Sequence, residues 1–302
     1  MSPTWFLLAF STTIISALVS LLDSHFMSRR MPGMRAYILI CNIFTVPASI
    51  IMLILFPVPA GIGLAPIWAI FASALVSSVA MVLILQAMKN QDVGSVAPLI
   101  STAPVFVAIL ATLFLGESLG LRQWFGIAAV VSGAVIISFK WDAKGTGHFH
   151  RKPFFMLMGA AILAATSSVI NKYALGFMSF WTCAGIDFLF ASILILIFCL
   201  RRDVLSSIGA LRDRQQAINL TVFNQAIATA ATVMAFWTIQ LGPVALASTV
   251  FNAKPLLIFA SSAVIGRLAP GFMVNEKLSP KGLAIKGAGT AAVVGGLVAM
   301  FI

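Results

Sequence analysis

The stretch from Ala87 to Gly126, AMKNQDVGSVAPLISTAPVFVAILATLFLGESLGLRQWFG, decides the fold because a weaker copy of it recurs from Trp237 to Gly287. Each copy contains an apolar run with an internal proline, then an acidic residue, then a second apolar run. The corresponding positions are Pro104 with Pro255 and Glu117 with Glu276. The sequence therefore predicts two related halves, which we place at residues 1–145 and 153–302.

The composition indicates that the chain lies in a lipid bilayer. Of its 302 residues 61% are hydrophobic and 9% are charged, which is far from the usage of soluble domains. Apolar runs of roughly 20 residues, long enough to cross about 30 Å of hydrocarbon, recur about ten times. Because lipid offers no partner for a free backbone amide, we expect an all-α integral membrane protein with ten transmembrane helices. The runs lie near residues 4–24, 35–56, 66–88, 93–115, 121–139, 154–174, 179–200, 217–240, 243–266 and 281–302.

The basic residues predict how the chain is oriented. They gather in the loops after the first, third, fifth, seventh and ninth spans, whereas the other loops hold only Arg122 and Lys172. By the positive-inside rule the basic loops face the cytoplasm, which puts both termini outside a bacterial-type inner (plasma) membrane. The net charge of +11 is then a topology signal and predicts no nucleic-acid partner.

The predicted spans also relate the two halves to each other. Each half holds five spans, an odd number, so the second half enters the membrane from the opposite side. The halves are thus predicted to be inverted repeats, and transporters built in this way bind their substrate near the midplane, where the repeats meet. Small residues predict close packing in the fifth and tenth spans; they are Gly126, Gly133, Gly287, Gly289, Gly295 and Gly296.

Three segments of the first half resemble a known family. They are PLISTAPVF at 98–106, LFLGESL at 113–119 and QWFGI at 123–127, and they are similar to the EamA-type repeat of the drug/metabolite transporter superfamily. The resemblance implies two inverted five-helix repeats around a central cavity lined by the first four helices of each half. It also implies that the fifth helices lie at the periphery or in a homodimer contact. Members of the family move amino acids, other metabolites, nucleotide sugars and drugs.

The prolines predict where spans bend. A proline inside a helix removes a hydrogen bond and clashes with the preceding turn, so Pro98, Pro104 and Pro255 should bend the fourth and ninth spans and act as hinges. Prolines are also commoner in membrane helices than in soluble ones, and this alternative stays open.

Two charged residues lie inside predicted spans, namely Asp187 in the seventh and Lys254 in the ninth. A charge at the centre of a spanning helix costs about 2.5–3.5 kcal/mol on insertion scales, so it usually faces protein or a wet cavity. Three interpretations stay open. The two residues neutralise each other structurally, or they bind the two charges of a zwitterion, or protonation of Asp187 couples transport to a proton gradient.

Other polar residues complete the candidate site for substrate binding or coupling. We align Asn42 with Asp187 and Ser101 with Lys254 in the two halves. Asp23 is expected near a membrane face in a solvated position. The remaining candidates are Asn252, Asn171, Gln225 and Gln86.

Motifs for enzymatic chemistry are absent from the sequence. It has no phosphate-binding Gly-Lys-Ser/Thr loop and no nucleophile elbow, so we expect no catalytic residues and no cofactor. His148 and His150 lack a third ligand, and we expect no metal site.

The sequence predicts a secondary active transporter of a small polar or zwitterionic, amino-acid-like metabolite, with proton or solute counter-transport and membrane lipid around it. One alternative is a transporter or flippase of an amphiphilic or lipid-linked solute. A further alternative is a membrane scaffold that transports nothing. A polar cavity that touches both halves would favour transport, and a filled interior would favour the scaffold.

Overall fold

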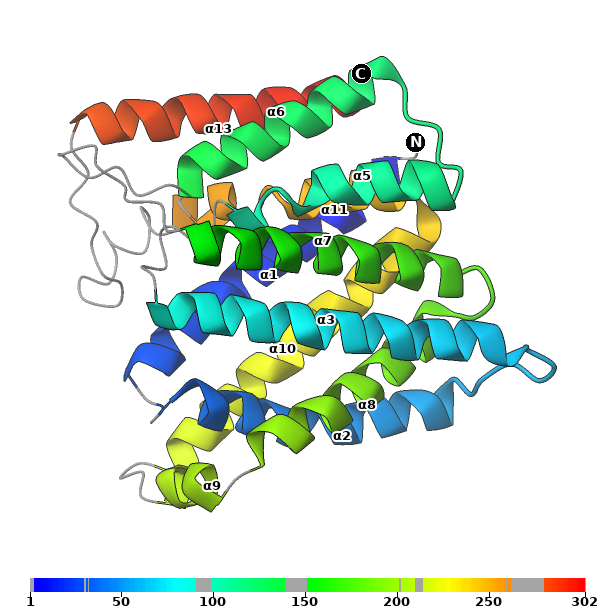
Figure 1. Ribbon diagram of the computed structural model, residues 1–302, viewed down its shortest axis with the longest axis vertical. Coiled ribbons are helices and arrows are strands. Elements are labelled where there is room, and N and C mark those ends of the chain that lie inside the picture. Colours follow the sequence, from blue (N-terminus) through cyan, green and yellow to red (C-terminus); the bar gives the residue numbers. More distant parts are fainter. Residues whose placement is uncertain are drawn as a thin grey trace.

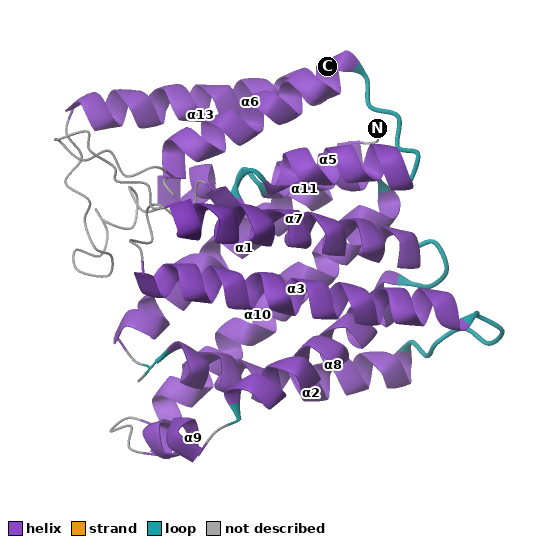
Figure 2. Cartoon of the chain, viewed as in Figure 1, coloured by secondary structure: helices purple, strands orange, loops and turns teal. Residues whose placement is uncertain are grey.

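The computed structural model describes residues 3–29, 31, 33–90, 99–138, 151–200, 202–209, 214–258, 260–261 and 280–301. Within these ranges the chain is helical and contains no strand (Figure 2). The helices are α1 (Pro3–Arg29), α2 (Met34–Leu55), α3 (Leu64–Asn90), α5 (Ala103–Phe114), α6 (Leu121–Ser138), α7 (Arg151–Ala174), α8 (Phe180–Cys199), α9 (Arg202–Gly209), α10 (Arg214–Leu241), α11 (Val244–Phe251) and α13 (Pro280–Phe301).

The long helices lie side by side in one bundle, and the two marked chain ends lie at the same end of it (Figure 1). Six helices in the described ranges are long and apolar enough to cross a membrane, and four apolar helices are shorter. The six are α1, α2, α3, α7, α8 and α10. The bundle therefore has the character of an integral membrane protein, as the composition predicts.

The most extensive helix contacts join one half of the chain to the other. They are α6 with α13, α3 with α7, α2 with α8, and α1 with α10 (Figure 1). By their order in the two halves, α1 matches α7, α2 matches α8, α3 matches α10 and α6 matches α13. The α6–α13 and α2–α8 contacts therefore join matching helices, and the α3–α7 contact is the counterpart of the α10–α1 contact. Exchanging the halves thus maps these contacts onto each other, which is the pattern of a two-repeat architecture.

The α6–α13 contact depends on glycine. A Cβ atom on Gly133 would lie 2.6 Å from the carbonyl oxygen of Gly289, and one on Gly296 would lie 2.8 Å from the carbonyl oxygen of Gly126. The two helices therefore approach each other through their backbones, as the small residues in these spans predict. Gly287 and Gly295 do not take part, because nothing lies within 4 Å of their Cβ positions.

Both proline-containing spans are interrupted at equivalent places. Ser101 and Thr102 form a turn directly before α5, and Asn252 and Ala253 form a turn directly after α11. The Asn252 Nδ2 atom donates a hydrogen bond of 2.7 Å to the Ser101 carbonyl oxygen, so the two interruptions touch each other.

The interruptions refine two expectations. Pro104 lies in the first turn of α5, where its missing N–H removes no helical hydrogen bond, and Pro255 directly follows Lys254 at the restart of the ninth span. Matching the prolines aligns Ser101 with Asn252, so the expected match of Ser101 with Lys254 is wrong. Pro98 lies outside the described residues, and the role of the three prolines as hinges stays a prediction.

Candidate substrate cavity

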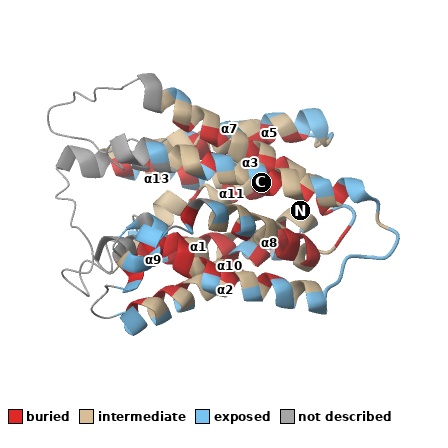
Figure 3. Cartoon of the chain, turned by 60° about the horizontal axis from the view of Figure 1, so that its bottom comes forward, coloured by how far each residue is buried: buried red, intermediate tan, exposed pale blue. Residues whose placement is uncertain are grey.

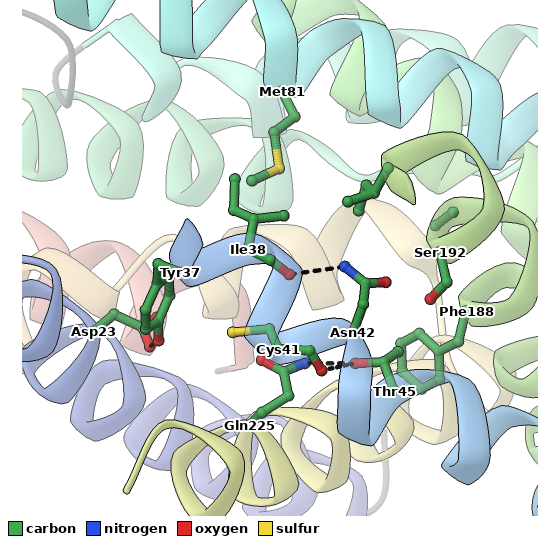
Figure 4. A pocket seen from close by; sticks show the side chains of 12 residues that line it. Asp23, Tyr37, Ile38, Cys41, Asn42, Thr45, Met81, Phe188, Ser192 and Gln225 are labelled. Atoms are coloured by element: carbon green, nitrogen blue, oxygen red, sulfur yellow. Dashed lines mark hydrogen bonds between the residues drawn. The ribbon is translucent and has the colours of Figure 1, made fainter. Parts of the chain in front are cut away.

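A cavity of about 290 Å³ lies between the two halves, with walls from α1, α2 and α3 of the first half and from α8 and α10 of the second (Figure 4). It lies toward the predicted cytoplasmic end, where α1 ends and α2 begins. The lining residues are Asp23, Tyr37, Ile38, Cys41, Asn42, Thr45, Met81, Phe188, Ala191, Ser192, Ile195 and Gln225. The wall therefore combines polar groups on α2 with apolar groups on α8.

Asp23 supplies the acidic side chain of this wall. Its Oδ1 atom accepts hydrogen bonds from the Tyr37 hydroxyl and from Asn224 Nδ2, the latter at 2.5 Å. Tyr37 and Asn224 are both buried, at 6% and 1% exposure, so two immobilised donors hold the carboxylate in place. Figure 4 shows the Asp23 and Tyr37 side chains together at one end of the cavity.

Lys254 supplies a positive charge near the same end. It interacts electrostatically with Asp23, and it has no hydrogen-bond partner among the described residues. The ammonium group comes from the interrupted ninth span and the carboxylate from the first span. The two charges thus belong to different halves of the chain.

Two side-chain amides on the cavity wall use their N–H groups in hydrogen bonds to other residues of the chain. Asn42 Nδ2 donates to the Ile38 carbonyl oxygen at 2.8 Å, and Gln225 Nε2 donates to the Thr45 hydroxyl at 3.1 Å (Figure 4). Their amide oxygens accept no hydrogen bond from a described residue. These oxygens are available to accept a hydrogen bond from an ammonium or hydroxyl group of a bound solute.

The structure places other sequence-based candidates elsewhere. Asp187 forms no salt bridge with Lys254, and its Oδ1 atom is buried without a hydrogen-bond partner. Asn171 is buried near the end of α7 opposite to the cavity, and Gln86 is exposed one turn before the end of α3. Lys254 thus interacts electrostatically with Asp23 and not with Asp187. That Asp187 and Lys254 together bind a zwitterion stays a prediction.

Sequence reasoning missed Asp23 and Tyr37 as site residues. Asp23 was expected in a solvated position near a membrane face. It lies at the end of the apolar part of α1, which spans Thr4–Asp23, but it is held by hydrogen bonds from Tyr37 and Asn224 instead of being solvated alone. Tyr37 is one of only two tyrosines in the chain, and it lies one turn before Cys41 and Asn42. A polar stripe on α2 that begins at Tyr37 was the signal in the sequence that could have identified this wall.

The opposite, predicted outer end of the cavity is closed by close packing of α2 against α8. A Cβ atom on Gly185 would lie 3.1 Å from Leu53, so the two helices touch there. Farther out, Phe56 stacks on Trp181 with ring centroids 5.1 Å apart, and the Thr182 hydroxyl donates to the Phe56 carbonyl oxygen at 3.0 Å. An apolar cluster of buried residues, among them Cys183, Ala184 and Val233, lies in this part of the bundle. Figure 3 colours the buried stretches of the chain red.

A set of hydrogen bonds around the turn at Gly242 and Pro243, which we name the outer latch, reinforces this closure. The Glu117 carboxylate accepts from the backbone N–H groups of Val244 and Ala245 at 2.7 and 3.3 Å, at the start of α11. Lys172 Nζ donates to the carbonyl oxygens of Ile239 and Gly242 at 2.6 and 2.8 Å, at the end of α10. These are the unpaired backbone groups that helix ends leave, so the latch satisfies both ends of the turn.

The fold and the cavity define the class as an integral membrane protein with two helical repeats around a central cavity. The model of the EamA-like transporter family matches residues 3–139 and 151–301, so the two matches cover both halves of the chain. The chain belongs to the EamA-like transporter family.

Two further comparisons found proteins that are similar to this chain. A protein named "uncharacterized transporter in cobO 3' region", from a Sinorhizobium species, is 43% identical over 53 residues, which cover 18% of this chain and 38% of that protein. A protein of known crystal structure has a TM-score of 0.70 at 17% identity, covering 100% of this chain and 97% of the other. At this identity the second likeness shows the fold alone.

Proposed function

We propose that this chain is a secondary active transporter of a small polar or zwitterionic organic solute and works by alternating access. The observation that carries the proposal is the cavity with Asp23, Tyr37 and Asn42 in its wall, lined by helices of both halves. Polar side chains inside spanning helices are costly and usually serve a solute or ion. A membrane scaffold would have no need of such a cavity.

The chemistry of the cavity supports a solute that carries a protonated amine. Asp23 is a fixed carboxylate that an ammonium group can approach, and the unused amide oxygens of Asn42 and Gln225 lie on the same wall. Lys254 adds a positive charge beyond Asp23, which suits the anionic group of a zwitterion. About 290 Å³ accommodates a solute of amino-acid size.

The membrane arrangement that belongs to this proposal has ten spans in two inverted repeats of five, with both termini outside. The exchange of halves that relates α3–α7 to α1–α10 supports the inverted arrangement. The common position of the two chain ends supports an even number of crossings (Figure 1). In the described conformation the cavity lies toward the predicted cytoplasm and the latch closes the outer end.

The test measures the melting temperature of the purified protein against a panel of amino acids, amines, carboxylates and sugars. A bound solute at free concentration c stabilises the folded state by RT ln(1 + c/Kd), so the melting temperature keeps rising with the logarithm of the solute concentration above Kd. We expect an amine-containing solute to stabilise the wild type, and Asp23→Asn to lose this shift while it keeps the Tyr37 hydrogen bond.

Asp203→Asn is the matched control, because Asp203 is exposed on α9 and away from the cavity. The same solute should accumulate in proteoliposomes that contain the wild type or Asp203→Asn. If Asp23→Asn binds and transports the solute as the wild type does, the cavity is not the substrate site. Absence of binding and uptake for every solute contradicts the transporter proposal.

A further inference from the structure

Beyond the cavity, toward the predicted outer end, the helices around it carry one more layer of polar residues. Ser49 lies one helical turn after Thr45 on α2, and Ser77 lies one turn before Met81 on α3. Residues four apart lie on the same face of a helix, so Ser49 and Ser77 lie on the helix faces that line the cavity, one turn farther out. The polar layer consists of Ser49, Ser77, Asp187 and Thr229.

The depth of the layer follows from the neighbours of its members. On α8, Asp187 lies one turn from Ala191 in the cavity wall and one turn from Cys183. On α10, Thr229 lies one turn from Gln225 in the cavity wall and one turn from Val233. Cys183 and Val233 belong to one apolar cluster that closes the bundle farther out. Asp187 and Thr229 therefore share a level between the cavity and the closure.

Two members of the layer have unused oxygen atoms. Asp187 Oδ1 and Thr229 Oγ1 are both buried without a hydrogen-bond partner, and Thr229 is 4% exposed. The Ser49 and Ser77 hydroxyls donate to carbonyl oxygens of their own helices at 2.7 and 3.0 Å, so each oxygen keeps its lone pairs as an acceptor. The layer thus presents oxygen acceptors and no described basic group.

This chemistry selects the ligand. A carboxylate that is buried without a partner is costly, and it becomes stable when a proton or a metal cation neutralises it. Divalent cations in proteins usually take more than one carboxylate, and the described residues contain no cluster of three metal-binding side chains. Cys183 is a titratable group that interacts electrostatically with Asp187. Among the described side chains of α2, α3 and α10, no other titratable group interacts with the Asp187 carboxylate.

We propose that the polar layer is the coupling site of the transporter and that Asp187 there binds one monovalent cation, a proton or Na⁺, separately from the solute at Asp23. This inference rests on the proposed function, because a coupling ion has meaning only for a transporter. The carboxylate of Asp187 carries the negative charge, and the hydroxyl oxygens of Thr229, Ser49 and Ser77 complete the site.

The first experiment measures cation binding with no solute present. Wild type, Asp187→Asn and the exposed control Asp203→Asn are melted at increasing Na⁺, with choline as the replacement cation. Infrared difference spectra between high and low pH are recorded for the same proteins. A Na⁺ site predicts a melting temperature that rises with Na⁺ in all but Asp187→Asn. A proton site predicts a carboxylic-acid C=O band that only Asp187→Asn lacks.

The outcomes that overturn the coupling site are equally defined. A wild type that shows neither response has no such site, and an Asp187→Asn protein that shows the wild-type response has it elsewhere. If Asp187→Asn fails to fold, Thr229→Val decides, because it removes only the hydroxyl group. We expect this variant to raise the Na⁺ concentration at half response, or to move the pH midpoint of the band, and an unchanged value contradicts the proposal.

A second experiment separates this inference from the proposed function. Solute accumulation in proteoliposomes is driven by an imposed Na⁺ or pH gradient. Asp187→Asn should still bind the solute in the melting assay but should lose gradient-driven accumulation. If cation binding depends on Asp187 while no solute is bound or moved, the proposed function fails and the cation site stands. If gradient-driven accumulation persists in Asp187→Asn, the coupling site fails and the transporter stands.

Discussion

Two hydrogen-bond donors hold the Asp23 carboxylate in place. The Tyr37 hydroxyl comes from α2 and the Asn224 amide comes from α10, so the carboxylate ties three helices of both halves together. A hydrogen bond to a charged group contributes about 1.5–3 kcal/mol. The orientation of the Asp23 carboxylate in the cavity therefore depends on Tyr37 and Asn224, two neutral side chains that act by donating hydrogen bonds to it.

Tyr37→Phe tests this positioning at the scale of one atom. The variant keeps the ring and removes the donor, so we expect Kd for the stabilising solute to rise about tenfold, since tenfold corresponds to about 1.4 kcal/mol. The other tyrosine provides the control, because Tyr173 is 43% exposed and lies outside the cavity lining. Thermal titration of both variants distinguishes the roles, and equal Kd values for Tyr37→Phe and Tyr173→Phe would contradict a positioning role.

The sequence shows that a residue is polar and how deep it lies along its own helix, but not which neighbour it faces. This explains why Asp187 and Lys254 could be interpreted as partners from the sequence, although Lys254 interacts electrostatically with Asp23. It also explains why Asn42 and Gln225 were identified correctly as polar residues inside spans, while their common cavity became visible only in the structure.

Among the helices, hydropathy predicted where each one lies along the chain, and the prolines predicted which of the spans are interrupted. Each predicted span overlaps a helix of the described chain. The exact place of each break did not follow, because Ser101 and Asn252 stop their helices before the prolines and bond across the halves. Such a contact depends on the partner helix, which no local pattern contains.

The α6–α13 contact provides a prediction about helix packing. In Gly133→Ala the new methyl group would meet the backbone of α13, with Gly289 O at 2.6 Å and Val293 N at 2.9 Å, so the helices must separate. We expect a loss of about 1–3 kcal/mol in stability. Gly287→Ala is the control on α13, because nothing lies within 4 Å of its Cβ position. Denaturant titration in detergent should show a lower midpoint for Gly133→Ala alone.

For the whole molecule, the described conformation predicts a sidedness that chemical labelling can measure. Cys41 lines the cavity, whereas Cys183 and Cys199 are buried elsewhere. With the latter two replaced by alanine, a membrane-impermeant thiol reagent should modify Cys41 faster in inside-out vesicles than in right-side-out vesicles. A stabilising solute should slow the reaction. Faster labelling in right-side-out vesicles would reverse the predicted orientation of the chain.

The outer latch has a consequence for how fast such a molecule can work. In the proposed alternating-access cycle, opening at that end would require the Glu117 and Lys172 bonds around the turn at Gly242 and Pro243 to exchange for water. Each such bond contributes about 0.5–1.5 kcal/mol, or more when charged, and every 1.36 kcal/mol changes a rate tenfold. In that proposed cycle, the latch at one end of the bundle would limit the rate of turnover, and the cavity at the other end would set the affinity for the solute. Selection for faster or slower flux can therefore act on the turn and leave the choice of solute untouched.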